Sequence, residues 1–374
     1  MEQQPSSLPT EIQQNFVYPA VSHLPVFIGT QNNPENDGIF LYRLNLNNGE
    51  LLPISSTKAG QKPGYLTLDK HRNFLYAANE CEKDPGTVRA FSIDPSDGKL
   101  TFLNQQTCSG PPCFVSIDHA NKVLLAANYG SGTVDSFLIK EDGSLEPMSD
   151  TKKHQGSSVN KDRQEGPHAH FIATDPTNKY ALAIDLGLDQ IIRYSLDIEK
   201  GTLSDPQVAF QAKPGAGPRH LAFHPNERFA YVVHELNSTV AVLAYDGNTG
   251  TFKEIETLKT IPEDFKEENL AAGIKLLPNG KVLYATNRGH DSIVVYGLDE
   301  NTGKLTFIGR VSTAGHWPRD FSVDPTGNFL IVSNERSNNL SVFRIHQETG
   351  KLDLIESKIQ VSKPTCVQII KDFC

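Results

Sequence analysis

The stretch Gly217-Pro218-Arg219-His220-Leu221-Ala222-Phe223-His224-Pro225, followed by the apolar run Phe229-Ala230-Tyr231-Val232-Val233, decides the fold of this chain. Apolar residues on both sides of a His-Pro turn predict two short antiparallel strands. Thr239 to Tyr245 predicts a third strand, and the glycine-containing turn Asp246-Gly247-Asn248-Thr249-Gly250 leads into a fourth. The segment therefore predicts a four-stranded antiparallel meander.

The same pattern of strands recurs along the chain. Copies of the first strand begin about 50 residues apart, a period typical of a β-propeller, at Pro63, Pro112, Pro167, Pro218, Ala271, Pro318 and Pro364. The last copy, Pro364 to Ile370, has no second strand after it. Conversely, Val26 to Thr30, Gly38 to Leu44 and Leu51 to Ile54 supply later strands of a blade with no first strand before them. We therefore predict an all-β, seven-bladed β-propeller, whose ring closes when the C-terminal strand joins the N-terminal blade.

A closed ring of repeats is a single domain even at the length of this chain, 374 residues. We expect the propeller to span residues 26–374 and the polar, proline-containing residues 1–25 to form a flexible extension. That extension lacks the basic start and apolar core of a secretory signal. The five cysteines favour reduced thiols over a disulfide framework. Together these features predict a cytoplasmic protein.

Charge and hydropathy exclude several classes of partner. The net charge of -9 and the pI near 5.7 argue against binding to nucleic acid or to an anionic membrane, because both attract basic surfaces. No apolar run is long enough to span a membrane. The oligomeric state is left open.

Propeller geometry predicts which residues surround the mouth of the central channel. The start of each first strand and the end of each second strand should lie on the same face. Aligning the copies places His170, Arg219 and Arg319 in one slot at the start of the first strand, where the other copies have Gly64, Cys113, Ala272 and Thr365. Strand entry does not require cationic or titratable side chains, so this slot, which we call the mouth slot, predicts an anion-binding site. Structural ion pairs, such as one between Arg219 and Glu235, are the alternative.

Two further patterns have less specific interpretations. The second strands end in a polar residue, which we interpret as a turn residue, at Asn79, Asn128, Asp185, His234, Asn287 and Asn334. In His168-Ala169-His170, residues two apart on a strand would face the same side and could both bind a metal. We favour a hydrogen-bonded histidine and no metal, because a metal centre needs a further ligand and only Glu235 or His220 is a candidate.

Several runs, taken in order, resemble the signature of the propeller lactonases, the family of the propeller-type 6-phosphogluconolactonases and the fungal carboxy-cis,cis-muconate cyclases. These runs are Asn128-Tyr129-Gly130-Ser131-Gly132, Gly166-Pro167-His168-Ala169-His170, Gly217 to Pro225, His234-Glu235-Leu236-Asn237-Ser238-Thr239-Val240, Asn287-Arg288-Gly289-His290-Asp291-Ser292 and Trp317-Pro318-Arg319-Asp320-Phe321. The resemblance implies a seven-bladed propeller that works without a metal, with its site at the channel mouth. It also implies that the catalytic residues are His170, with His168 as the alternative, and Arg219, Glu235 and Arg288.

The chain departs from the family pattern at two places. Members of the family often carry Ala-Glu/Asp-Ile-His where this chain has Ala272-Gly273-Ile274-Lys275, and Pro-Cys-His where it has Pro112-Cys113-Phe114. Both differences bear on substrate choice and on activity.

The resemblance implies hydrolysis of a small anionic lactone without a cofactor, with 6-phospho-D-glucono-1,5-lactone of the pentose phosphate pathway as first candidate. His170 or Glu235 would act as base on water, and Arg219 or Arg288 would stabilise the oxyanion. We expect Arg319 and the remaining arginine to hold a phosphate or carboxylate. Further substrate contacts are expected from His168, His220 and Asn287. The alternatives are a lactone-forming cyclase of the muconate type and a propeller that binds without turnover.

Overall fold

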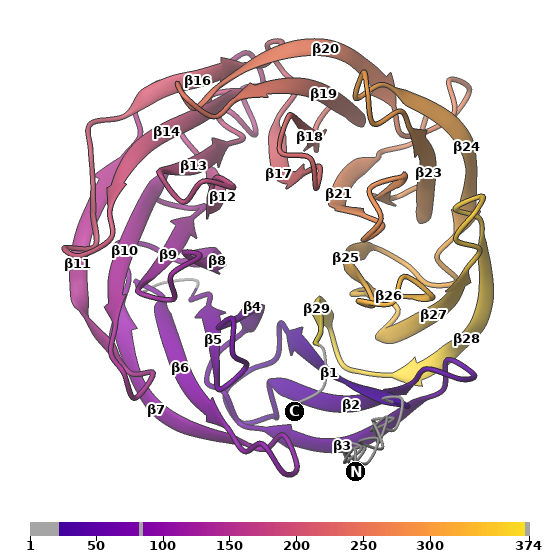
Figure 1. The fold of residues 1–374 in the computed structure, drawn as a ribbon, viewed down its shortest axis with the longest axis horizontal. Coiled ribbons are helices and arrows are strands. Elements are labelled where there is room, and N and C mark those ends of the chain that lie inside the picture. Colours follow the sequence, from indigo (N-terminus) through magenta and orange to yellow (C-terminus); the bar gives the residue numbers. More distant parts are fainter. Residues whose placement is uncertain (1–21, 82–84, 371–374) are drawn as a thin grey trace, which may run out of the picture.

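The computed structural model describes residues 22–81 and 85–370, which contain strands, turns and loops but no helix. These residues form seven antiparallel sheets, arranged as the blades of a ring around a central channel (Figure 1). The predicted seven-bladed β-propeller is therefore confirmed. Within the described ranges, no helix is long and apolar enough to cross a membrane.

The first blade combines the two ends of the described chain. From the channel outward its strands are β29 (Pro364–Ile369), β1 (His23–Thr30), β2 (Ile39–Asn45) and β3 (Leu51–Thr57). β29 pairs antiparallel with β1, with Gln368 opposite Phe27. The predicted closure of the ring is confirmed, and the inner edge of β1 is paired rather than open. β1 begins at His23, and most of the predicted extension of residues 1–25 lies outside the described residues.

The other six blades follow one another in sequence order. The second and third consist of β4 (Pro63–Leu68), β5 (Phe74–Asn79), β6 (Thr87–Ile93) and β7 (Leu100–Thr107), then β8 (Pro112–Ile117), β9 (Val123–Asn128), β10 (Thr133–Ile139) and β11 (Leu145–Lys153). The fourth and fifth consist of β12 (Ala169–Thr174), β13 (Tyr180–Asp185), β14 (Gln190–Asp197), β15 (Thr202–Leu203) and β16 (Gln207–Gln211), then β17 (Pro218–Phe223), β18 (Phe229–His234), β19 (Thr239–Asp246) and β20 (Thr251–Lys259). The sixth and seventh consist of β21 (Leu270–Leu276), β22 (Val282–Arg288), β23 (Ser292–Leu298) and β24 (Leu305–Ser312), then β25 (Pro318–Val323), β26 (Phe329–Asn334), β27 (Asn339–Ile345) and β28 (Leu352–Gln360). In the fourth blade the outer strand is divided into β15 and β16, and the intervening Pro206 has no N–H with which to pair β14.

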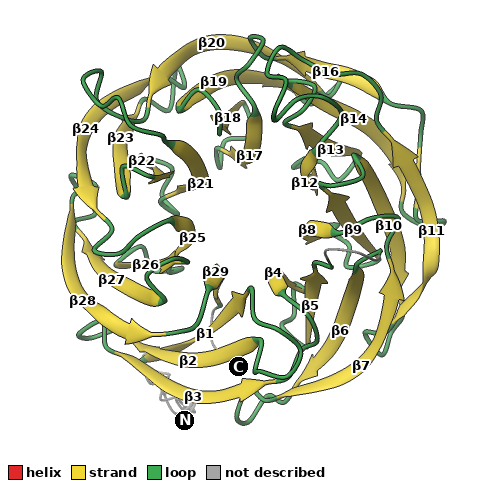
Figure 2. Ribbon diagram, turned by 180° about the vertical axis from the view of Figure 1, so that it is seen from behind, coloured by secondary structure: helices red, strands yellow, loops and turns green. Residues whose placement is uncertain are grey.

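The core lies between the faces of neighbouring blades. The second strands β9, β13, β18 and β26 are buried along their whole length because another blade covers each face. Buried tyrosines on second strands also tie blades together. The hydroxyl of Tyr76 donates to the carbonyl of Gly143 at 2.9 Å, and that of Tyr231 donates to Gly303 at 3.0 Å, in each case in the next blade. Packing and these bonds hold the first strands in a fixed ring around the channel, as Figure 2 shows from the other face.

A shift of register interrupts the first strand of every blade at the mouth slot. In β17, Pro218 lies opposite His234 and His220 lies opposite Val233, so that Arg219 has no partner in the ladder. Equivalent shifts leave unpaired the mouth-slot residues of the other blades, Gly64, Cys113, His170, Ala272 together with Gly273, Arg319 and Thr365. A β-bulge of this kind re-aims side chains and is common beside binding sites. The mouth slot is thus a ring of bulged residues.

The asparagines that end the second strands are not turn residues, so that interpretation is wrong. None of Asn79, Asn128, Asn287 and Asn334 has a positive φ. Instead, the side-chain amide of Asn79 donates to the carbonyl of Ala59 at 2.8 Å, and that of Asn287 donates to Thr260 at 3.1 Å. Both carbonyls lie in the connection that enters from the preceding blade. These amides satisfy the backbone of that connection and lock neighbouring blades in place.

Candidate active site

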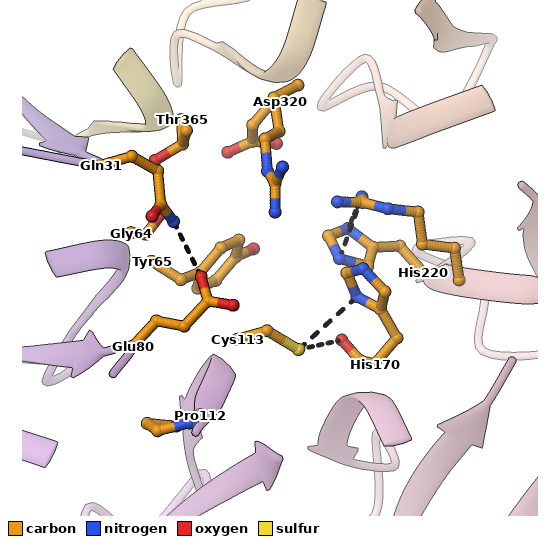
Figure 3. A pocket seen from close by; sticks show the side chains of 12 residues that line it. Gln31, Gly64, Tyr65, Glu80, Pro112, Cys113, His170, His220, Asp320 and Thr365 are labelled. Carbon is orange, nitrogen blue, oxygen red and sulfur yellow. Dashed lines mark hydrogen bonds between the residues drawn. The ribbon is translucent and has the colours of Figure 1, made fainter. Parts of the chain in front are cut away.

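A narrow pocket lies at the mouth of the channel, where bulged residues of different blades meet (Figure 3). Its empty space is about 350 Å³, including the part open to solvent. Six of the seven mouth-slot residues contribute to its wall: Gly64, Cys113, His170, Arg219, Arg319 and Thr365. The fold therefore brings His170, Arg219 and Arg319 together, although they come from three different blades.

His170 is the titratable group with the most unusual surroundings in the pocket. It is only 6% exposed, and its Nδ1 lies 3.9 Å from the Sγ of Cys113. Its ring and that of His220 are in an edge-to-face arrangement, with 5.2 Å between the ring centroids. Burial, and then the positive charge of Arg219, lower the pKa of His170 well below its ordinary value. The imidazole is therefore neutral at neutral pH. Within the described part of the chain, its Nε2 makes no hydrogen bond and so is available to a ligand.

Glu235, directly after β18, forms ion pairs with three arginines. Its Oε2 is 2.7 Å from the Nη2 of Arg288 and 3.1 Å from the Nε of Arg219, and its Oε1 accepts a hydrogen bond from the Nη2 of Arg163 at 2.6 Å. The Nε of Arg219 is not aligned for a hydrogen bond, so this contact is an ion pair only. Burial would raise the pKa of Glu235, but the charges of Arg288 and Arg219 outweigh it and hold that pKa far below its usual range.

The arginines differ in how firmly they are held. The Nη1 of Arg219 donates to the carbonyl of Ala272 at 2.9 Å, and Arg288 donates to the carbonyls of Leu270 and Ala271. Burial, and then the charge of Arg288, lower the pKa of Arg219 to about 10, so this guanidinium remains charged at neutral pH. By contrast, Arg319 makes one long bond, from its Nη1 to Glu335 at 3.4 Å. Arg319 is therefore the arginine of the pocket that is most free to bind an anion.

Four of the residues predicted from sequence lie outside the pocket wall, namely Glu235 and Arg288, which are described above, and His168 and Asn287. The ring of His168 stacks on Tyr129, its Nδ1 donates to the carbonyl of Tyr129 at 3.0 Å, and its Nε2 lies 3.1 Å from Glu165. Asn287 is fully buried and ties its blade to the preceding one, as described above. His168 precedes β12 and His170 is the bulged residue, so the two histidines do not share a face as residues two apart in a regular strand would. Both imidazole rings lie against Tyr129, and of the two only His170 lines the pocket.

The structure also adds pocket residues that the repeat alignment did not single out. Asp320 and Tyr65 each follow a mouth-slot residue, as does His220, which was expected from the sequence as a substrate contact, and all three line the pocket. A bulge turns consecutive side chains toward the same side, which is why the neighbour of a slot residue also reaches the channel. Arg163 comes from the long connection between β11 and β12, which has no counterpart in other blades, so the repeat could not indicate it.

The two departures from the family pattern lie next to residues of the pocket wall. The ring centroid of Phe114 is 4.2 Å from that of Tyr65 and 5.2 Å from that of His220, both of which line the pocket. The positive charge of Lys275 acts to lower the pKa values of His220 and Asp320, which also line it.

Fold and site together define a class: a closed β-propeller with a pocket of arginine and histidine at its channel mouth. The chain belongs to the family of seven-bladed β-propeller lactonases, which it matches over residues 25–369. A 6-phosphogluconolactonase of Bacillus subtilis is 40% identical over 346 residues, which cover 92% of this chain and 97% of the relative. A 6-phosphogluconolactonase of Formosa agariphila is 32% identical over a region that covers 81% of this chain and 87% of the relative. The structure of a periplasmic gluconolactonase of Pseudomonas aeruginosa superposes with a TM-score of 0.88 at 29% identity, covering 94% of this chain and 100% of the other. The resemblance predicted from the sequence motifs is confirmed.

Proposed function

We propose that this protein hydrolyses the δ-lactone of a sugar acid, with 6-phospho-D-glucono-1,5-lactone as its substrate, and that water attacks directly without a metal. The observation that carries the proposal is the convergence of His170, Arg219 and Arg319 on one pocket. The relatives named 6-phosphogluconolactonase and gluconolactonase support the class of reaction. A cytoplasmic location and a place in the pentose phosphate pathway are part of the same proposal.

His170 is the general base of this mechanism. Its lone pair at Nε2 takes a proton from the water whose oxygen forms the new bond to the lactone carbonyl carbon. The imidazolium then returns that proton to the ring oxygen as the carbon to ring-oxygen bond breaks. The low pKa of His170 keeps the imidazole neutral before the reaction, which a base requires.

Arg219 stabilises the oxyanion, and Glu235 positions it. Glu235 is a poor base because both of its oxygens already face arginines, whereas the Nε2 of His170 makes no such contact. The Arg288 guanidinium lies behind Glu235 and is not part of the pocket wall. The carboxylate therefore fixes the guanidinium of Arg219, so that no reorganisation is needed as negative charge develops on the carbonyl oxygen.

The test is the rate at which the purified protein opens 6-phosphogluconolactone in the presence of a chelator, compared with buffer alone. Arg219→Ala should lose activity by about 100-fold or more, the size expected for a removed oxyanion donor. Arg228→Ala is the matched control, because Arg228 lies in a turn where it bonds the carbonyl of Glu300, and it should behave as wild type. Rates for wild type that equal buffer, or that vanish with chelator, would contradict the proposal.

A propeller that binds an anionic metabolite without turnover is the second candidate. It is favoured by the mutual ion pairs of Arg163, Arg219 and Arg288 with Glu235, since such networks also occur purely as structural ties. If none of a panel of lactones were opened faster than in buffer while gluconate or 6-phosphogluconate still bound, this second function would be the correct one.

A further inference from the structure

The pocket has two chemically different sides. His170, Arg219 and Arg319 provide donors and positive charge, whereas Glu80 and Asp320 provide carboxylates. Figure 3 shows Glu80 and Tyr65 across the pocket from His170 and His220, with Asp320 at a third side. The side-chain amide of Gln31 already donates to Glu80 at 3.0 Å. Asp320 has no comparable partner.

Asp320 is a buried carboxylate with an unused oxygen. It is 1% exposed, and its Oδ2 accepts only a long hydrogen bond from the backbone N–H of Val367, at 3.3 Å. Its Oδ1 has no hydrogen-bond partner, and among the described residues no cation forms an ion pair with it. Leaving such a group unpaired in a protein interior costs free energy, which a hydrogen-bond donor of a bound ligand would offset.

The fold fixes the place of this carboxylate. Asp320 follows the bulged residue Arg319 and pairs with Ser333 of β26, whose hydroxyl donates to the Asp320 carbonyl at 2.9 Å. The backbone of Asp320 is therefore held, and Asp320 forms part of the pocket wall, with its unpartnered Oδ1 buried there. Burial raises the pKa of Asp320 above its ordinary value, although the charge of Lys275 and the N–H groups of Val367 and Phe321 act in the opposite direction.

We propose that Asp320 accepts a hydrogen bond from a hydroxyl of the substrate, and that it thereby selects polyhydroxylated lactones over unsaturated diacids. This inference rests on the proposed function and deepens it. The arginines attract any small anion and cannot by themselves separate the two kinds of ligand. A buried carboxylate can, because it accepts from a hydroxyl and repels a second carboxylate.

The first test compares two six-membered lactones, D-glucono-δ-lactone and δ-valerolactone, which has the same ring without hydroxyls. Asp320→Asn should lower kcat/KM for the sugar lactone by about 10- to 100-fold, which is the range for a lost hydrogen bond to a charged group. The same substitution should change kcat/KM for δ-valerolactone by less than about 3-fold. Asp97→Asn removes the same charge from an exposed site paired with Lys99 and should leave both rates unchanged. An equal loss on both lactones from Asp320→Asn would overturn the inference, because a general electrostatic effect on the reacting groups acts on both.

The second test does not need turnover. Calorimetry of the wild-type protein should show at least about 10-fold tighter binding of D-gluconate than of adipate or hexanoate, which have similar chains without hydroxyls. Equal affinities would refute hydroxyl recognition. If instead gluconate were preferred, and this preference were lost in Asp320→Asn, but no lactone were opened faster than in buffer, the proposed hydrolase would fail while the role of Asp320 would stand.

Discussion

At the scale of single residues, burial decides what each ionisable group of the site can do. Glu235 and His170 both looked suitable as the base when only the sequence was considered. In the folded protein, Glu235 is held as an anion by buried arginines, and His170 is held neutral. A buried ion pair seldom stabilises a protein more than apolar residues of the same size would. Its value here is therefore the fixed direction that it gives to Arg219.

His234 is the residue for which we predict an effect of pH on stability. Its Nδ1 donates to the hydroxyl of Thr239 at 2.8 Å, its Nε2 is buried without a partner, and burial lowers its pKa from 6.5 to about 4. The unfolded chain therefore binds a proton that the folded protein resists, so stability is complete above about pH 6.5 and falls as the pH drops toward 4. Four other blades have asparagine at this position. The free energy of unfolding, measured by urea titration, should fall between pH 7.5 and pH 5 in both proteins. The fall should be about 2 kcal/mol smaller for His234→Asn than for wild type. Parallel losses in the two proteins would contradict the assignment.

At the scale of strands, the sequence predicted where elements begin and end but not how their side chains are aimed. Apolar runs and turn residues located β18 and β19 to within one residue of the bounds that the structure has. The bulge at the mouth slot leaves no periodic signal, because one extra residue at a strand start looks like a shift of the boundary. For this reason His168 and His170 were expected on one face, and the contribution of Asp320 to the pocket was not foreseen. The asparagine ties were missed because their partners lie in a neighbouring blade.

The bulge also predicts that its side chain can be changed with little effect on folding, since it has no partner in the ladder. Thr365 occupies this slot in the first blade, so Arg319→Thr should stay within about 1 kcal/mol of wild type in free energy of unfolding, because its pair with Glu335 is long and partly exposed. If Arg319 binds the phosphate, KM for 6-phosphogluconolactone should rise by about 10- to 100-fold, and KM for D-glucono-δ-lactone should change little. Steady-state kinetics on both substrates measure this difference. An equal rise for the two would show that Arg319 does not bind the phosphate.

At the scale of the whole molecule, the sequence was most informative, because a closed ring of repeats determines which strands pair and which residues share a face. The first strand that begins at Pro364 has no second strand after it, and the first blade lacks a first strand. We therefore predicted that the two would pair, and the structure confirms it. The mouth slot likewise predicted that distant residues of three blades would meet. The contact of Arg163 with Glu235 could not be predicted, because Arg163 lies in a connection that does not belong to the repeat. The burial of each side chain could not be predicted either, because it depends on the packing of neighbouring blades, which the alignment of repeats does not show.

Ring closure gives the last prediction. β29 contributes buried Thr365, Cys366 and Val367, and it covers the inner edge of β1. A chain that ends at Lys363 would expose that edge and open the core between the first and last blades, where a domain has only about 5–15 kcal/mol of stability to lose. We expect this variant to lose its cooperative thermal transition and to aggregate, whereas a chain that ends at Ile370 should melt as wild type does. Calorimetry and size-exclusion chromatography on the two truncations test this. A cooperative transition at the wild-type temperature in the shorter chain would contradict this prediction, because it would mean that the blades are stable without closure of the ring.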